Sequence, residues 1–167
     1  MKVLTFLLIT ALLFSCTQIK DNELSEEQKS KIKQEIQPVI AQLYEAAAKV
    51  DTTKLYDIFS FSEDFTYVEI TGAFYNQVVY KKMVGEFWGQ ITSEMIAKGT
   101  EKYTYLNANN VLWSYSGSIM VTFKNGQQAN YDPFGMSLLF KKSNDQWKIV
   151  FVQESAQEPA QADTTKH

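Results

Sequence analysis

The side chains that most often carry out chemistry are scarce in this sequence. It has one histidine, His167, and one cysteine, Cys16. His167 lies at the end of the polar tail, so a Ser-His-Asp triad is not expected, and one histidine cannot build a metal site of several histidines. There is also no glycine-rich phosphate loop. The sequence therefore predicts no metal and no cofactor, which leaves a carboxylate as the candidate catalytic group.

Glu69 is that candidate. It lies in Phe65–Thr71, a segment whose alternation and β-rich composition predict a strand. Phe65, Tyr67 and Glu69 would then share one face. A carboxylate buried in an aromatic cleft has a raised pKa and can act as a general base. The alternative is an ordinary polar residue near a strand end, which reaches water or pairs with a lysine.

The start of the sequence has the composition of a secretory signal. Lys2 is followed by an uncharged, largely apolar run over residues 3–14. As a helix this run is too short to cross a hydrocarbon core of about 30 Å. Residues 1–15 are therefore predicted to be a signal peptide rather than a membrane span.

The residues that end this segment indicate a lipid anchor. The pattern Leu13-Phe14-Ser15-Cys16 resembles the lipobox of bacterial lipoproteins, where the cysteine is lipidated and becomes the mature N-terminus. Cys16 is therefore the predicted lipidation site, with an incidental free thiol as the alternative. The predicted location is the bacterial cell envelope, anchored in the outer membrane on the periplasmic side or at the cell surface.

Composition divides the rest of the chain into a tether, one domain and a tail. Residues 16–24 are mostly polar and read as a tether, and residues 25–155 hold the periodic apolar pattern of a domain. Residues 156–167 are polar and predicted to be a disordered tail. The net charge is −3 and no basic cluster is present, so nucleic acid is not an expected partner.

Apolar spacing predicts helices first and strands later. Ser25 with Gln28 forms a capping-box pattern before a long amphipathic helix, and Asp51 caps a short second helix. Residues 79–97 return to helical spacing. The predicted strands after these helices are residues 103–108, 111–123, 130–142 and 146–154. Together they predict an α+β fold, a curved antiparallel sheet with three N-terminal helices packed on one face.

This layout resembles the nuclear transport factor two-like (NTF2-like) superfamily, which includes ketosteroid isomerases and SnoaL-like polyketide cyclases. The similarity rests on Val50-Asp51 with the following Leu55 and Phe59, and on the closing hairpin over residues 135–150. It covers about residues 27–155 and implies a cone-shaped α+β barrel. The superfamily contains enzymes, binding proteins and assembly modules, so the fold does not name a function.

The resemblance also implies a pocket at the open end of the barrel. Glu69 matches the position of the catalytic carboxylate of ketosteroid isomerases, and Tyr44 lies near the position of their tyrosine. Gln153 stands on the last strand, where other members carry a histidine. The predicted pocket residues are Tyr44, Phe65, Tyr67, Trp88, Trp113, Tyr115 and Gln153.

Three functions remain open from the sequence. The first is binding of a small hydrophobic molecule or a peptide-like partner. The second is a cofactor-free isomerase or lyase that uses Glu69 as its base, and the third is a structural dimerisation module. A homodimer is also expected, because residues 137–140 and 149–152 are apolar at positions on both faces of their strands.

The lipid anchor makes a direct prediction. The change Cys16→Ser should leave the protein unprocessed by the lipoprotein route, because serine lacks the thiol that carries the lipid. Metabolic labelling with a fatty acid should mark the wild type alone. Equal labelling of both proteins, or of neither, would show that Cys16 is not the anchor.

Overall fold

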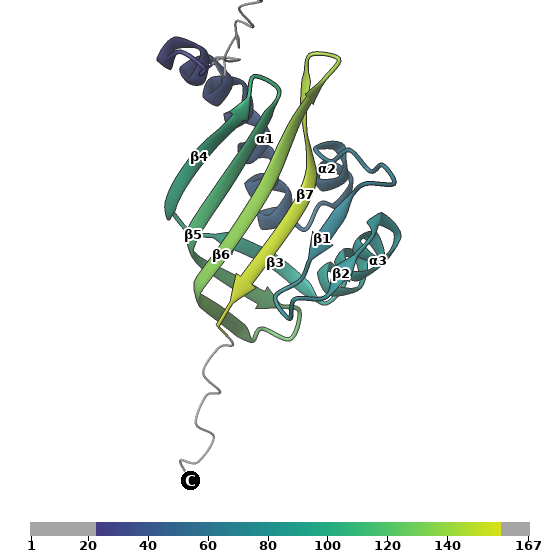
Figure 1. The fold of residues 1–167 in the computed structure, drawn as a ribbon. Coiled ribbons are helices and arrows are strands. Elements are labelled where there is room, and N and C mark those ends of the chain that lie inside the picture. Colours follow the sequence, from purple (N-terminus) through teal and green to yellow (C-terminus); the bar gives the residue numbers. More distant parts are fainter. Residues whose placement is uncertain (1–22, 158–167) are drawn as a thin grey trace, which may run out of the picture.

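The computed structural model describes residues 23–157 (Figure 1). The predicted signal peptide, Cys16, the tether up to residue 22 and the tail from residue 158 lie outside this range. The elements in chain order are α1 (Glu26–Lys49), α2 (Thr52–Asp57), β1 (Thr66–Val68), β2 (Phe74–Tyr75), α3 (Gln77–Trp88), β3 (Ile91–Ile96), β4 (Thr100–Asn107), β5 (Asn110–Phe123), β6 (Gln128–Ser143) and β7 (Gln146–Ala156).

Local sequence determines where α1 begins and which face it buries. The Ser25 side chain accepts a hydrogen bond from the Gln28 backbone, and the Gln28 side chain accepts one from the Ser25 backbone, so the predicted capping box is present. Ile32, Ile36 and Ile40 lie on one stripe and are buried. The helix continues through Pro38.

No helix within residues 23–157 combines the length and apolarity needed to cross a bilayer.

The predicted helix over residues 79–97 is wrong in its second half. α3 ends at Trp88 with Gly89 as its C-cap, and β3 follows from Ile91. Glycine is among the poorest helix formers, and Ile91 and Thr92 are β-branched residues that favour strands. Ile91 and Met95 are spaced as in a helix, so the sequence pattern did not reveal that the helix ends before them and a strand begins.

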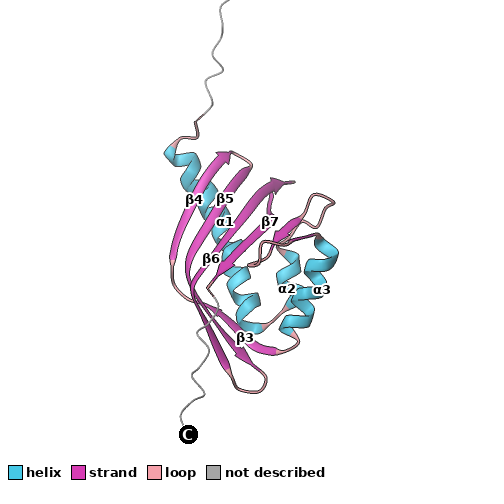
Figure 2. Ribbon diagram, turned by 60° about the horizontal axis from the view of Figure 1, so that its bottom comes forward, coloured by secondary structure: helices cyan, strands magenta, loops and turns pink. Residues whose placement is uncertain are grey.

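The strands form one curved sheet of seven strands. Its order is β2-β1-β7-β6-β5-β3, with β4 also paired to β5. The pairing of β1 with β7 is parallel, which makes the sheet mixed rather than wholly antiparallel. Figures 1 and 2 show the sheet curving around α1, with α2 and α3 beside β1. The predicted fold class, α+β with N-terminal helices on one face of a curved sheet, is confirmed.

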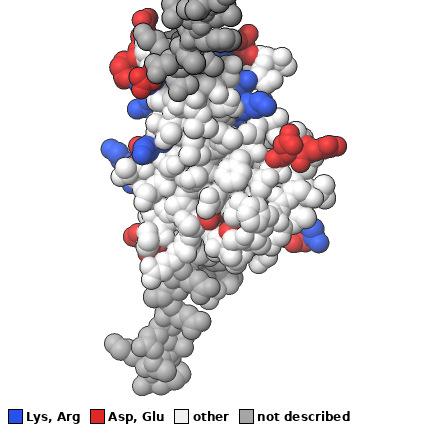
Figure 3. Space-filling model, viewed as in Figure 1, with Lys and Arg blue, Asp and Glu red and all other residues white. Residues whose placement is uncertain are grey.

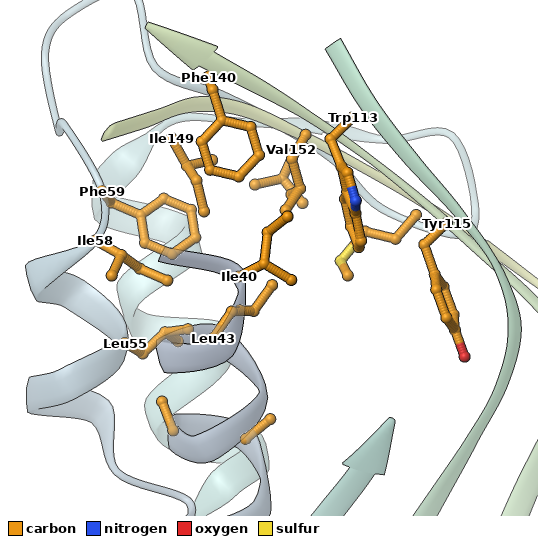
Figure 4. Packing of buried hydrophobic residues seen from close by; sticks show 14 of the residues in the cluster. Ile40, Leu43, Leu55, Ile58, Phe59, Trp113, Tyr115, Phe140, Ile149 and Val152 are labelled. Carbon is orange, nitrogen blue, oxygen red and sulfur yellow. The ribbon is translucent and has the colours of Figure 1, made fainter. Parts of the chain in front are cut away.

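The core lies between α1 and the concave face of the sheet. Ile40 and Leu43 of α1 lie opposite sheet residues such as Trp113 and Val152 (Figure 4). Trp113 is fully buried. Burial of a large apolar side chain stabilises the fold by roughly 1.5–3 kcal/mol, so this cluster is the main source of stability in a domain without disulfides.

Two β-bulges change which side chains face the concave side. Along β7, Trp147 and Ile149 are buried, and the register shift opposite Leu139 and Phe140 then moves the inward positions to Val152 and Glu154. Along β3, a shift between Ile91 and Ser93 has the same effect and brings Glu94 and Ile96 to the concave side. Without the extra residue, strict alternation would have placed odd-numbered residues there.

The opposite face of the sheet carries small and apolar side chains. Leu112, Leu139 and Phe151 are cross-strand neighbours there, and each is partly exposed. Ser114 and Ser137 lie beside them, with their hydroxyl oxygens 3.4 Å apart. Charged residues are sparse over the centre of the face seen in Figure 1 and gather towards its edges (Figure 3). Residues 149–152 are apolar at positions on both faces of their strand, and the bulge in β7 accounts for part of this pattern because it changes which residues face inward.

The homodimer remains a prediction, and the structure shows which residues should test it. Val152 and Leu138 belong to the core, so a lysine at either would unfold the protein rather than probe an interface. Leu139→Lys or Phe151→Lys should convert a dimer to a monomer in analytical ultracentrifugation. Val78→Lys, at an exposed site on α3, is the matched control and should leave the dimer intact. A wild type that sediments only as a monomer at tens of micromolar, roughly the scale of weak dimers, contradicts the prediction.

Candidate functional site

A cavity of about 290 Å³ opens between the concave face of the sheet and the helices. Its walls are mainly aliphatic and aromatic, and the described residues contribute three carboxylates, those of Glu69, Glu94 and Glu154. The remaining lining residues are Leu43, Ala47, Leu55, Tyr67, Ile70, Tyr80, Met83, Val84, Phe87, Trp88, Ile96, Ile119, Val121, Tyr131, Phe134, Met136 and Ala156.

An aromatic cluster fixes one wall of this cavity. Phe59, Phe61 and Phe65 pack against Tyr80, with ring centroids 5.3 to 6.2 Å from it. Tyr67 meets Tyr80 edge to face at 5.1 Å. Such pairs add about 0.5–1.5 kcal/mol beyond their buried area. Tyr80 is therefore held by the phenylalanine rings behind it, and Tyr67 packs against Tyr80.

Glu154 and Tyr67 form a polar pair in the cavity wall. The Tyr67 hydroxyl donates to Glu154 Oε2 at 2.8 Å and joins the side chains of β1 and β7. Burial, followed by the negative charge of Glu94, raises the pKa of Glu154 to about 7, although the tyrosine hydrogen bond opposes this rise. Glu154 can therefore both accept and release a proton near neutral pH.

Glu94 is the second carboxyl of the cavity. Trp88 Nε1 donates to Glu94 Oε2 at 2.9 Å, a bond from the last residue of α3 to β3. Burial raises the pKa of Glu94, and the indole hydrogen bond opposes this rise. Glu94 and Glu154 thus resemble each other: each is partly buried and accepts a hydrogen bond from an aromatic side chain, not from a lysine.

Glu69 differs from these two residues. β1 ends at Val68, so Glu69 stands in a tight turn that Gly72 completes with a φ of 85°. The Glu69 carboxylate lines the cavity but is partly exposed, and it accepts a hydrogen bond from the Thr71 hydroxyl at 2.7 Å. The strand predicted over residues 65–71 is therefore shorter, and Glu69 lies at the edge of the cavity.

Of the predicted pocket residues, Tyr67 and Trp88 line the cavity. Phe65 is buried behind it in the aromatic cluster. Gln153 lies outside it with an exposed side chain, because the bulge in β7 places the next residue on the concave side. The expectation that Gln153 lines the pocket is therefore wrong for a geometric reason.

Three other predicted pocket residues lie elsewhere in the core. Tyr44 and Trp113 approach the carboxylate of Glu101, with donor–acceptor distances of 3.5 and 3.3 Å. The Tyr115 hydroxyl donates to the backbone oxygens of Ala97 and Ser118. These aromatic residues shape the barrel near β4 and do not line the cavity.

The polar groups of the cavity suit hydrogen bonding and proton transfer. Of the residues that the structure describes, no lysine, arginine or histidine lines the cavity. Within residues 23–157, no group of three or more histidine, cysteine, aspartate or glutamate side chains is arranged to hold a metal ion. The chemistry available to this described part of the site is that of partly buried acids and their aromatic donors.

Comparisons with known proteins identify the fold. No model of a known family matches the sequence, and no curated protein matches it at a significant level. Among solved structures, the chain is similar to a putative scytalone dehydratase from Novosphingobium aromaticivorans, with a TM-score of 0.71, 8% identity, and coverage of 84% of this chain and 93% of the other. It is also similar to the hexachlorocyclohexane dehydrochlorinase LinA-type3 from Novosphingobium barchaimii, with a TM-score of 0.68, 10% identity, and coverage of 86% and 98%.

A third similar structure is an NTF2-like superfamily protein from Salmonella enterica, with a TM-score of 0.64, 18% identity, and coverage of 83% of this chain and 99% of the other. The fold is therefore that of the NTF2-like superfamily, as the sequence resemblance implied. At these identities the similarity establishes the fold alone, so function must be argued from the cavity.

The raised pKa of Glu154 predicts a specific dependence of stability on pH. Between its ordinary value of 4.5 and about 7, folded Glu154 holds a proton that the unfolded chain releases. Its contribution to the free energy of unfolding is therefore complete below about pH 4.5 and falls by about 3 kcal/mol as the pH rises through 7.

Urea denaturation at several pH values should show this effect as a difference between two proteins. Glu154→Gln keeps an acceptor for Tyr67 but cannot titrate, so the variant should gain stability relative to the wild type as the pH rises. Glu86→Gln, at an exposed position on α3, should run parallel to the wild type. A constant separation between wild type and Glu154→Gln would mean that Glu154 titrates as an ordinary carboxyl.

Proposed function

We propose that this protein is a lipid-anchored component of the bacterial cell envelope whose domain binds a small hydrophobic molecule in the cavity. The observation that carries the proposal is a cavity of about 290 Å³ with apolar walls and a few convergent polar groups. A purely structural module would fill this space with side chains. The size of the cavity favours a small molecule over a peptide-like partner.

The placement of two glutamates in the cavity wall supports a binding role over a structural one. Glu94 and Glu154 could have been replaced by apolar residues with a gain in core stability, because a buried carboxyl is costly without a full set of partners. Instead, both face the open space. Carboxylates that face the cavity in this way can bind a ligand, whereas they do little to stabilise the fold.

The second candidate is a cofactor-free isomerase or lyase. It is favoured by Glu154, whose pKa of about 7 and contact with Tyr67 suit a general base and a neighbouring donor. The buried Glu154 fits this role better than Glu69 at the cavity edge. An enzyme of this kind would exchange an acidic C–H proton of its bound molecule with D₂O, and mass spectrometry would detect this exchange.

The binding proposal is tested with the neutral probe N-phenyl-1-naphthylamine, which fluoresces in apolar surroundings. The wild type should bind it saturably, and Met83→Trp should abolish binding by filling the cavity. Val78→Trp is the matched control, because Val78 is on the same helix and 71% exposed. Circular dichroism should show that both variants are folded. Equal binding by wild type and Met83→Trp would place the probe outside the cavity and contradict the proposal.

A further inference from the structure

Among residues 23–157, the cavity is lined by acidic groups and by no basic side chain. Three carboxylates line it, together with the hydroxyl-bearing Tyr67, Tyr80 and Tyr131, and these six are the titratable groups that the described residues contribute. An anion such as a fatty acid would meet repulsion there. A neutral apolar molecule would bury its surface but leave the carboxylates without a partner of opposite charge.

Glu94 and Glu154 each have an oxygen available to a ligand. The hydrogen bonds from Trp88 and Tyr67 both end on Oε2, and among residues 23–157 we find none to either Oε1. No fully buried side-chain oxygen in this described part lacks a partner, so the two Oε1 atoms are accessible from the cavity. An ammonium group brings three donors and no acceptor, which matches acceptors of this kind.

The walls are also suited to a cation attached to an apolar body. The aromatic rings of Tyr67, Tyr80 and Trp88 stand beside the carboxylates, and ring faces attract cations within about 6 Å. Met83, Val84 and Ile119 provide the aliphatic surface that an aryl or alkyl group would cover. The three carboxylates of the cavity are not grouped to hold a divalent metal, because no cluster of three such ligands is found among the described residues.

We propose, building on the binding function above, that the occupant of the cavity is a hydrophobic organic cation, an aryl-alkyl amine whose ammonium group lies against Glu94 and Glu154. The cation would supply the positive charge that the site lacks, and its apolar body would fill the aliphatic part of the cavity. Charge-assisted hydrogen bonds to ionised carboxylates are about twice as strong as neutral ones, so the charge should decide selectivity.

Binding of a cation should be linked to proton release. The groups that face the ammonium position are Glu94 on β3, Glu154 on β7, Tyr67 on β1 and Tyr80 on α3, with Glu69 at the cavity edge. Because burial and Glu94 hold the pKa of Glu154 near 7, a bound cation would lower that pKa and expel a proton. Affinity for the amine should therefore rise between about pH 6 and about pH 8, while the affinity for a neutral analogue stays level.

The test uses tryptamine, its neutral analogue tryptophol and the anion indole-3-propionate. Isothermal titration calorimetry is run on protein purified from cells that express the full chain. At about pH 7.5, tryptamine should bind at least about ten-fold more tightly than tryptophol, which corresponds to about 1.4 kcal/mol. Indole-3-propionate should bind most weakly. Titrations in buffers of different ionisation enthalpy should show proton release with tryptamine alone.

Charge-removing variants locate the effect. Glu94→Gln combined with Glu154→Gln should abolish the preference for tryptamine while retaining tryptophol binding. Glu86→Gln removes one negative charge outside the cavity and should keep the preference for tryptamine. This control distinguishes the charge of the cavity from the net charge of the protein. Equal affinity for tryptamine and tryptophol, no binding of tryptamine, or a preference that survives the double substitution would each overturn the inference. If N-phenyl-1-naphthylamine still binds in the cavity, the binding function remains supported although the inference about a cation is wrong. If this neutral probe does not bind either, both proposals are wrong.

Discussion

The alternation of side chains along a strand is the constraint on which the cavity depends, and β3 and β7 are among the strands that break it. In β3 and in β7, the bulge changes the inward-facing positions from odd-numbered to even-numbered residues. Glu94 and Glu154 come after these bulges and therefore face the concave side. Bulges commonly re-aim side chains near functional sites. Here they bring two acids from opposite parts of the sheet into one apolar space, which a regular sheet of the same sequence would not do.

The sequence predicted the fold well because its signals were local and repeated. The capping box at Ser25, the stripe of isoleucines in α1 and the Asp51 cap of α2 each had a short-range physical cause. Glu94 was missed because residues 91–96 also fit a helical spacing. Glu154 was missed because alternation from Trp147 and Ile149 favours Gln153 as the inward residue. A bulge depends on pairing with another strand, so a single sequence does not reveal it.

Carboxylates elsewhere in the molecule have two kinds of hydrogen-bond partner. Glu35 accepts hydrogen bonds from Lys142 and Trp147, which lower its pKa. Hydrogen bonds from Lys49 and Lys54 lower the pKa of Glu45 to about 2. Glu35 and Glu45 are thus paired with lysines. Among residues 23–157, the donors to Glu94 and Glu154 are aromatic, as are those to Glu101 outside the cavity. Glu94 and Glu154 differ from Glu101 in lining the cavity, where a bound molecule can reach them.

The direction of α1 has a consequence for how a ligand arrives. The helix begins at Glu26, and the residues it contributes to the cavity, Leu43 and Ala47, lie near its other end. At 1.5 Å per residue, Leu43 is about 25 Å further along the axis than the helix start. If Cys16 carries a lipid, the anchor precedes the end of α1 that is far from the cavity. The attachment of the domain and its cavity would therefore be separated along the length of this helix.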